Sequence, residues 1–261
     1  MRGRRASGWS WRGEGTPGNT TVLELPTAPW AHLAGNVAAV LAASLGALWQ
    51  RKFDAKPAGN ATRLRTEPSY YRALAVGALL GAWLMGSLNA MPSGLTPTHS
   101  VAGALAGAIA GVELWKWRHG VRGSTGGSFV LPLALGIMVG RLGCLFAGLA
   151  DFTHGVPTQL PWAVDLGDGL GRHPVQLYES LAMALYVLVW WPAWRRRAPW
   201  ATNHAFHAFV IYYASQRFCW EFLKPYPKVF GPFNLFHLVC LGLVIYGIFC
   251  WWRDKTTGRS A

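Results

Sequence analysis

The chain has 261 residues, of which 52% are hydrophobic and only 13% are charged, and its formal net charge is +13 at pH 7. Soluble domains carry about a quarter charged residues, so this composition excludes an ordinary soluble protein. The basic residues gather in alternate loops between apolar segments instead of forming one patch, which argues against nucleic acid as the partner.

Long apolar segments recur along the whole chain. A spanning helix needs roughly 20 mostly apolar residues, because each residue rises about 1.5 Å through a hydrocarbon core about 30 Å thick. Apolar residues cover all faces of these segments, which is typical of membrane helices. We therefore predict an all-α polytopic membrane protein whose transmembrane helices, about seven in number, span residues 30–49, 71–90, 99–117, 128–147, 174–194, 203–223 and 230–252.

The charge pattern predicts the orientation and the flanking regions. Loops rich in Lys and Arg stay in the cytoplasm, which puts the N-terminus outside and the C-terminus inside. Residues 1–28 read as a disordered basic and polar tail, residues 29–252 as the transmembrane domain, and residues 253–261 as a cytoplasmic tail. The outer loop 148–173 is crowded with Gly, Pro and Asp, which predicts turns, and it either covers a site or is a plain connector.

Two further patterns within the predicted helices concern packing. Gly103, Gly107 and Gly111 are four residues apart and form a face that lets two helices approach closely. The four cysteines lack the spacing of a zinc site or a disulfide framework. We expect neither a metal nor a cofactor.

Polar residues gather near the predicted outer ends of four helices. Arg141 lies about six residues, or roughly 10 Å, below the end of its helix, and Arg217 lies at nearly the same depth of another. His99 opens a third helix. The fourth begins within "GRHPVQLYES", which contributes Arg172, His173, Gln176, Tyr178 and Glu179.

Two buried arginines at the same depth repel each other unless an anion lies between them. Tyr213, Arg217 and Glu221 are four residues apart and share a helical face, so Glu221 can neutralise Arg217, but Arg141 has no acid on its own helix. A phospholipid fits this arrangement, because guanidinium groups bind phosphate bidentately while the acyl chains stay in lipid. Asp151, Asp165 and Asp168 are either turn formers or partners for the arginines.

These residues fall in four ordered motifs, "GLTPTHS", "GRLG", "RHPVQLYES" and "YYASQRFCWEFLK". From about residue 71 to 250 the chain resembles the prolipoprotein diacylglyceryl transferase family, which are bacterial inner-membrane enzymes with seven helices. The resemblance implies transfer of diacylglycerol from phosphatidylglycerol to a lipobox cysteine, leaving a thioether. It also implies that His99 is the family's essential histidine, that Arg141 is the motif arginine and that Gly94 matches a family position. The later catalytic set of the family falls on Tyr213, Arg217 and Glu221.

The chain also departs from the family pattern. The family motif continues G-R-x-G-N-F-x-N-G-E, whereas this chain has Cys144, Ala147 and Leu149 at the two Asn positions and the Glu position. Ser100 replaces a Gly, and an Arg usual in the second matched helix is absent. The chain therefore reads as a divergent branch, in which lipid binding in the outer leaflet is a safer prediction than the reaction.

The predicted mechanism is substitution at the glycerol carbon next to the phosphate, with His99 as the base for a thiol of pKa near 8.5. Arg141 and Arg217 stabilise the leaving phosphate. The expected partners are phosphatidylglycerol, a prolipoprotein lipobox peptide and membrane lipids. Two alternatives remain at this point: a non-catalytic lipid-binding or transport protein on the same scaffold, and a transferase that uses the same lipid with a different acceptor.

Overall fold

The computed structural model describes residues 22–53, 67–91 and 99–256. Within these ranges the chain forms seven long helices, and each of them corresponds to one of the predicted apolar segments. Their bounds are α1 Trp30–Phe53, α3 Pro68–Ala90, α4 Val101–Arg118, α5 Val130–Ala147, α6 Val175–Arg195, α8 Ala205–Glu221 and α9 Leu235–Thr256. The predicted all-α architecture is therefore confirmed.

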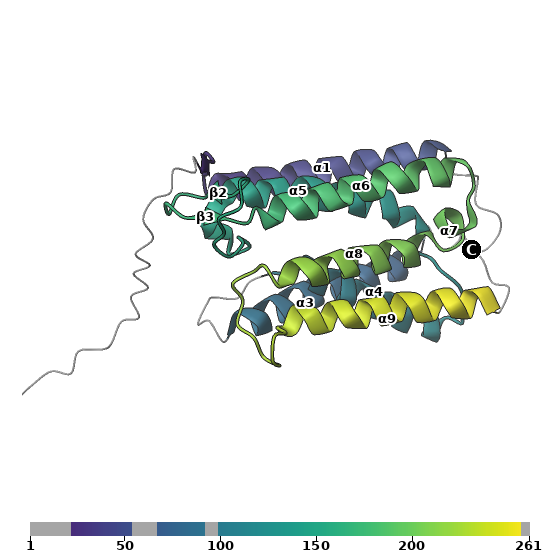
Figure 1. Ribbon diagram of the computed structural model, residues 1–261. Helices are drawn as coiled ribbons and strands as arrows, with labels where there is room; N and C mark the ends of the chain where they lie inside the picture. Colours follow the sequence, from purple (N-terminus) through teal and green to yellow (C-terminus); the bar gives the residue numbers. More distant parts are fainter. Residues whose placement is uncertain (1–21, 54–66, 92–98, 257–261) are drawn as a thin grey trace, which may run out of the picture.

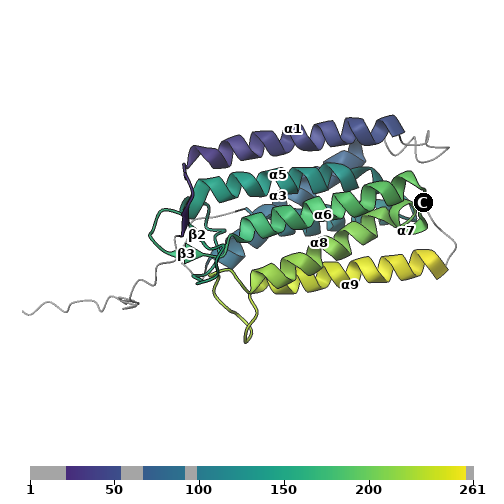
Figure 2. The same cartoon turned by 45° about the horizontal axis from the view of Figure 1, so that its top comes forward.

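The long helices form two layers (Figure 1). One layer contains α1, α5 and α6, and the other contains α3, α4, α8 and α9. Neighbours in sequence pair within each layer, since α3 packs on α4 and α8 on α9, while α5 contacts both α1 and α6. The contact of α6 with α8 joins the two layers near the predicted site, and the turned view in Figure 2 shows these two helices side by side.

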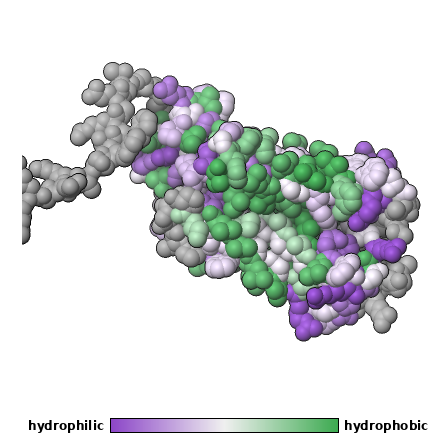
Figure 3. Space-filling model, turned by 90° about the horizontal axis from the view of Figure 1, so that it is seen from below, coloured by the Kyte–Doolittle hydropathy of each residue, from purple (hydrophilic) through white to green (hydrophobic). Residues whose placement is uncertain are grey.

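Helices α1, α3, α5 and α9 are each long and apolar enough to cross a membrane. The other three are shorter or carry charged residues, such as Glu113 in α4, Glu179 in α6 and Arg217 in α8. Figure 3 shows a broad apolar band over the middle of the molecule and polar residues gathered at its ends, as a membrane protein requires. The number of spans and their orientation stay predictions.

Short elements complete the fold. The single-turn helices are η2 Gly127–Phe129, η3 Gly148–Asp151 and α7 Pro199–Thr202. Strands β1 Leu23–Glu24, β2 Val164–Asp165 and β3 Gly171–Arg172 form a small sheet in the order β1-β2-β3. Leu23 pairs with Val164 in parallel, and Val164 pairs with Arg172 antiparallel.

Several element boundaries differ from those that the sequence predicts. Residues 23 and 24 belong to the predicted disordered tail, yet they form β1, because the outer loop offers β2 as a partner. The last helix starts at Leu235 rather than at residue 230, since Gly231 adopts a φ of 54° and Pro232 follows it. The same helix continues to Thr256, past the predicted domain end at residue 252.

Glycine faces hold two helix pairs close together. A Cβ on Gly107 would collide with the carbonyl oxygen of Gly77 in α3, and a Cβ on Gly103 with that of Gly81. The predicted close approach along this face is therefore confirmed. In the other layer Gly143, the last residue of "GRLG", lies against Gly35 of α1 in the same way. This contact fixes α5, which carries Arg141.

Candidate functional site

Arg141 of α5 and Arg217 of α8 meet at one carboxylate, Glu179 of α6. Nε of Arg141 lies 2.6 Å from Oε2 of Glu179, and Nη1 of Arg217 donates to Oε1 of the same side chain. All three side chains are buried. The predicted convergence of the two arginines is confirmed, but the anion between them in this structure is a protein carboxylate.

A second ring of polar residues surrounds these three. Lys224 donates from Nζ to Oε1 of Glu179 over 2.8 Å, and Glu221 lies 3.2 Å from Nη2 of Arg217. The amide of Asn234 donates to Oε1 of Glu221 over 3.1 Å. The pairing of Arg217 with Glu221 is the one that the spacing of four residues predicts, so that alternative is also confirmed.

Local packing explains why Glu179 reaches Arg141. The hydroxyl of Ser180, the next residue of α6, donates to the backbone carbonyl of Met138 over 2.8 Å. Met138 lies one turn before Arg141 in α5, so this bond fixes α6 against α5 at the depth of the arginine. Val175 and Gln176, in the first turn of α6, are fully buried as well.

The cluster contains more cations than carboxylates. Three cations, Arg141, Arg217 and Lys224, surround two carboxylates, Glu179 and Glu221, so one positive charge is uncompensated within this cluster. Burial lowers the pKa of Lys224, which lies beyond the end of α8, to about 8. The ion pair of Lys224 with Glu179 favours the charged form of the lysine against this effect. The site therefore favours a further anion.

Several buried polar atoms at the site lack a partner. The amide of Gln176, the hydroxyl of Tyr213 and Nε of Arg217 form no hydrogen bond in the part of the chain that the structure describes. The ion pair of Arg141 uses Nε, and its terminal nitrogens have no hydrogen-bond partner among the described residues. Because buried polar groups are normally hydrogen-bonded, these atoms indicate a polar ligand or water.

The predicted site residues Arg172, His173 and Tyr178 form no hydrogen bond or ion pair with the charged cluster in the described part of the chain. Arg172 forms a 2.5 Å ion pair with Asp168 and donates to the carbonyl of Gly155. Its hydrogen bonds hold the pKa of Asp168 below the ordinary value. Nδ1 of His173 lies 3.4 Å from the hydroxyl of Tyr178, which also accepts from the indole of Trp162. In this structure these residues therefore form their polar contacts with the outer loop and the first turn of α6.

Both readings of the loop aspartates apply, each to a different residue. Oδ1 of Asp165 accepts from the backbone amides of Gly167, Asp168 and Gly169, as a turn former does. Asp168 is the one that pairs with an arginine. The side chain of Asp151 and the whole of Gly94 lie outside the described residues.

His99 is exposed and stands before Ser100, which caps α4 through a bond from the amide of Gly103. It forms no hydrogen bond or ion pair with any described residue. Its assignment as the base therefore stays a prediction.

Three polar residues in or beside the cluster are not among the predicted site residues. Lys224 lies three residues after Glu221 and seven after Arg217, which is the spacing of one helical face and a signal that could have found it. Nδ1 of His237 lies 2.9 Å from Oδ1 of Asn234. Asn234 itself carries no signal in the sequence.

The departures from the family motif leave an apolar patch beside the site. Ala147 is buried, and Leu149 packs on a cluster of Leu145, Val164 and Leu166 beneath the outer loop. Apolar packing thus takes the place of the family's Asn and Glu at these positions. The polar side chains of the site come instead from Arg141 of α5, from α6 and α8, and from Lys224 and Asn234 in the segment after α8.

Comparison with known proteins shows the family of the chain. The family model of prolipoprotein diacylglyceryl transferase matches residues 70–253. Three similar curated proteins are all named phosphatidylglycerol–prolipoprotein diacylglyceryl transferase. The one from Bordetella parapertussis is 34% identical over 55% of this chain and 53% of its own length. The one from Solidesulfovibrio magneticus is 30% identical over 66% and 70%, and the one from Coxiella burnetii is 31% identical over 61% and 63%.

The chain spans about half the length of the first of these relatives. No solved structure matches it.

Proposed function

This chain belongs to the prolipoprotein diacylglyceryl transferase family, and from that premise we propose that it transfers a diacylglyceryl group from phosphatidylglycerol to a cysteine thiol. The acceptor is the lipobox cysteine of a lipoprotein precursor, and the product is a thioether. The proposed location is the bacterial inner membrane, where lipid and precursor meet.

The uncompensated positive charge of the buried cluster is the observation that carries this proposal. A phosphodiester headgroup supplies one negative charge, which balances the excess of Arg141, Arg217 and Lys224 over the two carboxylates. The free donors of both guanidinium groups suit a tetrahedral anion. Such preorganised cations in a site of low dielectric constant are worth several kcal/mol to a developing charge.

The proposed step forms one bond and breaks one. The thiolate sulfur bonds to the glycerol carbon that carries the phosphate, and the carbon–oxygen bond to that phosphate breaks. The thiol proton goes to the imidazole of His99. The electron pair leaves with the phosphate as glycerol phosphate, which Arg141 and Arg217 stabilise.

Other residues hold this arrangement. Glu179 and Glu221 orient the two guanidinium groups, and the hydroxyl of Tyr213 and the amide of Gln176 are free to contact the headgroup. Arg172 and His173 belong to the outer loop, and Tyr178 lies in the first turn of α6. We propose that these three residues contact the lipid at the membrane surface.

Purified protein incubated with labelled phosphatidylglycerol and a lipobox peptide tests the proposal. We expect label on the peptide and released glycerol phosphate, and loss of both in Arg141→Ala and His99→Ala. Arg118→Ala is the control, because Arg118 is an exposed arginine at the opposite end of the bundle. Transfer at the wild-type rate by Arg141→Ala would refute the proposal. Binding without turnover would favour a lipid-binding protein, and glycerol phosphate without labelled peptide a different acceptor.

A further inference from the structure

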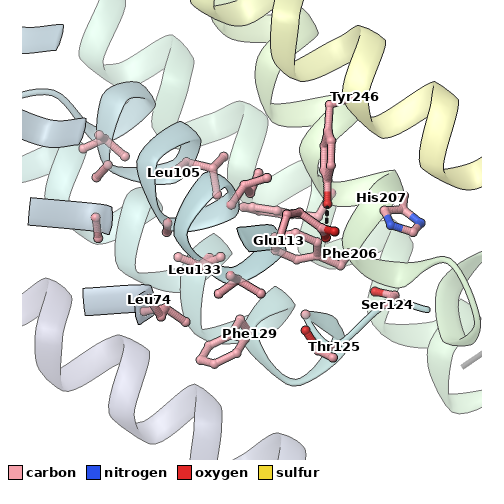
Figure 4. A pocket seen from close by; sticks show the side chains of 18 of the residues that line it. Leu74, Leu105, Glu113, Ser124, Thr125, Phe129, Leu133, Phe206, His207 and Tyr246 are labelled. Atoms are coloured by element: carbon pink, nitrogen blue, oxygen red, sulfur yellow. Dashed lines mark hydrogen bonds between the residues drawn. The ribbon is translucent and has the colours of Figure 1, made fainter. Parts of the chain in front are cut away.

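A cavity of about 190 Å³ lies between the two layers of helices. Its walls are almost entirely apolar and include Ala104 and Ala108 of α4, Leu133 and Ile137 of α5, and Phe209 of α8. Figure 4 shows lining side chains from both layers around one space, among them Leu105 of α4 and Leu133 of α5. The reaction proposed above does not use this cavity.

Two residues of the cavity lining lie one helical turn from residues of the site. Ile137 precedes Arg141 by one helical turn in α5, and Phe209 precedes Tyr213 by one turn in α8. The rings of Phe209 and Tyr213 stack with centroids 6.1 Å apart. A lipid whose phosphate lies at the arginines therefore has an apolar space beneath it.

The lower end of the cavity is closed by polar groups. Glu113 accepts hydrogen bonds from the hydroxyl of Tyr246 over 2.9 Å and from Nζ of Lys116 over 2.7 Å. Figure 4 shows the bond from Tyr246 to Glu113 as a dashed line among the lining side chains. Thr125, beside Glu113 in the lining, bonds the hydroxyl of Tyr70 over 3.1 Å. A hydrocarbon chain that reached these groups would displace their hydrogen bonds.

The length of the cavity matches one acyl chain. Along α4 its lining runs from Val101 to Glu113, which corresponds to roughly 18 Å at about 1.5 Å per residue. The hydrocarbon of one leaflet is about 15 Å thick, half of the bilayer core. The space between the charged cluster and the polar groups at Glu113, Tyr246 and Thr125, which we call the floor, thus suits one acyl chain of a membrane lipid.

We infer that this cavity holds one acyl chain of the donor lipid and that the floor at Glu113, Tyr246 and Thr125 limits the length of that chain. The inference rests on the proposed function, because it takes the donor phosphate to lie at Arg141 and Arg217. Each further methylene that cannot be buried forfeits roughly fourfold in affinity. The protein should therefore discriminate between donors by chain length.

Native mass spectrometry of the purified protein with equimolar dimyristoyl and distearoyl phosphatidylglycerol tests this inference. Ala108→Leu fills the cavity from α4 and should lower the retained distearoyl-to-dimyristoyl ratio at least about fivefold. Ala110→Leu is the matched control, because it makes the same change two residues away on an exposed face, and it should leave the ratio as in the wild type. Phe129→Ala removes a ring from the lower end of the lining and should raise the ratio.

An unchanged ratio in both lining variants, or an equal change in the Ala110→Leu control, would overturn the inference. The readout is binding, so its failure is distinguishable from failure of the proposed function. Shifted ratios without transfer to the peptide refute the reaction and leave the chain site standing. Transfer to the peptide with unchanged ratios refutes the acyl-chain site and supports the reaction.

Discussion

At the scale of single residues, Glu179 is the carboxylate that links the three cations of the site. It contacts Arg141, Arg217 and Lys224, which come from two other helices and the segment after α8. A carboxylate in this place removes most of the cost of burying three cations. Together with Glu221 it leaves one positive charge for a ligand, so the site is preorganised for an anion before any lipid arrives.

Replacing this carboxylate should therefore be costly. Glu179→Gln leaves the buried cations without their shared acid, and we expect a loss of about 3–5 kcal/mol in the free energy of unfolding. The loss is measurable as a lower melting temperature in detergent. Asp168→Asn, which breaks the partly exposed pair with Arg172, is the comparison and should cost less than about 1 kcal/mol. Equal effects of the two changes would contradict this account of the cluster.

A pH dependence follows from the pair in the outer loop. The pKa of Asp168 is lowered in the folded protein by its hydrogen bonds from Arg172. A lowered folded pKa means that the pair stabilises the loop above the unfolded value of about 3.9 and that this stabilisation is lost as the pH falls below it. Amide exchange of residues 155–172, corrected for intrinsic rates, should therefore be faster at about pH 3 than at about pH 6. Asp168→Asn should abolish the difference, and a loop whose corrected exchange ignores pH would argue against the pair.

At the scale of the elements, close helix contacts depend on glycine. The α3–α4 pair brings backbone against backbone, since Gly77 and Gly81 face Gly103 and Gly107. Association in lipid relies on such packing because there is no hydrophobic driving force between helices there. The pair forms one wall of the cavity, so its spacing also sets the width of the proposed acyl-chain site.

One methyl group at this contact should be enough to disturb it. A Cβ at Gly107 would meet the carbonyl of Gly77, so Gly107→Ala should destabilise the protein by about 1–3 kcal/mol. Gly242→Ala in α9 is the matched control, because a Cβ there meets nothing within 4 Å, and it should be neutral or stabilising by up to about 1 kcal/mol. Melting temperatures of the two variants compare them directly. A Gly107→Ala variant as stable as the control would show that stability does not depend on the close contact between α3 and α4.

At the scale of the whole molecule, the position of the basic residues follows the direction of each helix. Helices α1, α4, α6 and α9 carry basic residues in their last turn, and α3, α5 and α8 carry none there. The first group ends where the positive-inside rule puts the cytoplasm, and the second group ends beside the site. This alternation supports the predicted orientation with the site at the outer face.

Reporter fusions test that orientation. Green fluorescent protein fused after residue 261 should fluoresce, and alkaline phosphatase fused there should be inactive, because the predicted C-terminus lies in the cytoplasm. A phosphatase fusion within the outer loop near residue 160 should be active and serves as the control. Active phosphatase at the C-terminus would invert the molecule and place the charged cluster in the wrong leaflet for the proposed reaction.

The sequence by itself determined the class of the protein, its seven helices and its family motifs. These follow from local quantities: the length of an apolar segment, the spacing of residues on one helix and the order of motifs. The pairing of Arg217 with Glu221 was predictable for the same reason, since helical periodicity alone brings residues four apart together. Helix ends were less predictable, as the late start of α9 after Gly231 shows.

Only the tertiary structure decided which acid lies between the arginines, how Lys224 joins the cluster and that a cavity runs beneath it. These features depend on how each helix is rotated and how closely it packs on its neighbours, and spacing within one helix carries no information about either. Glu179, grouped by sequence with its neighbours in "RHPVQLYES", faces Arg141 because α6 is held against α5 by Ser180 and Met138. The contacts between helices, rather than the helices themselves, turn scattered polar residues into a site.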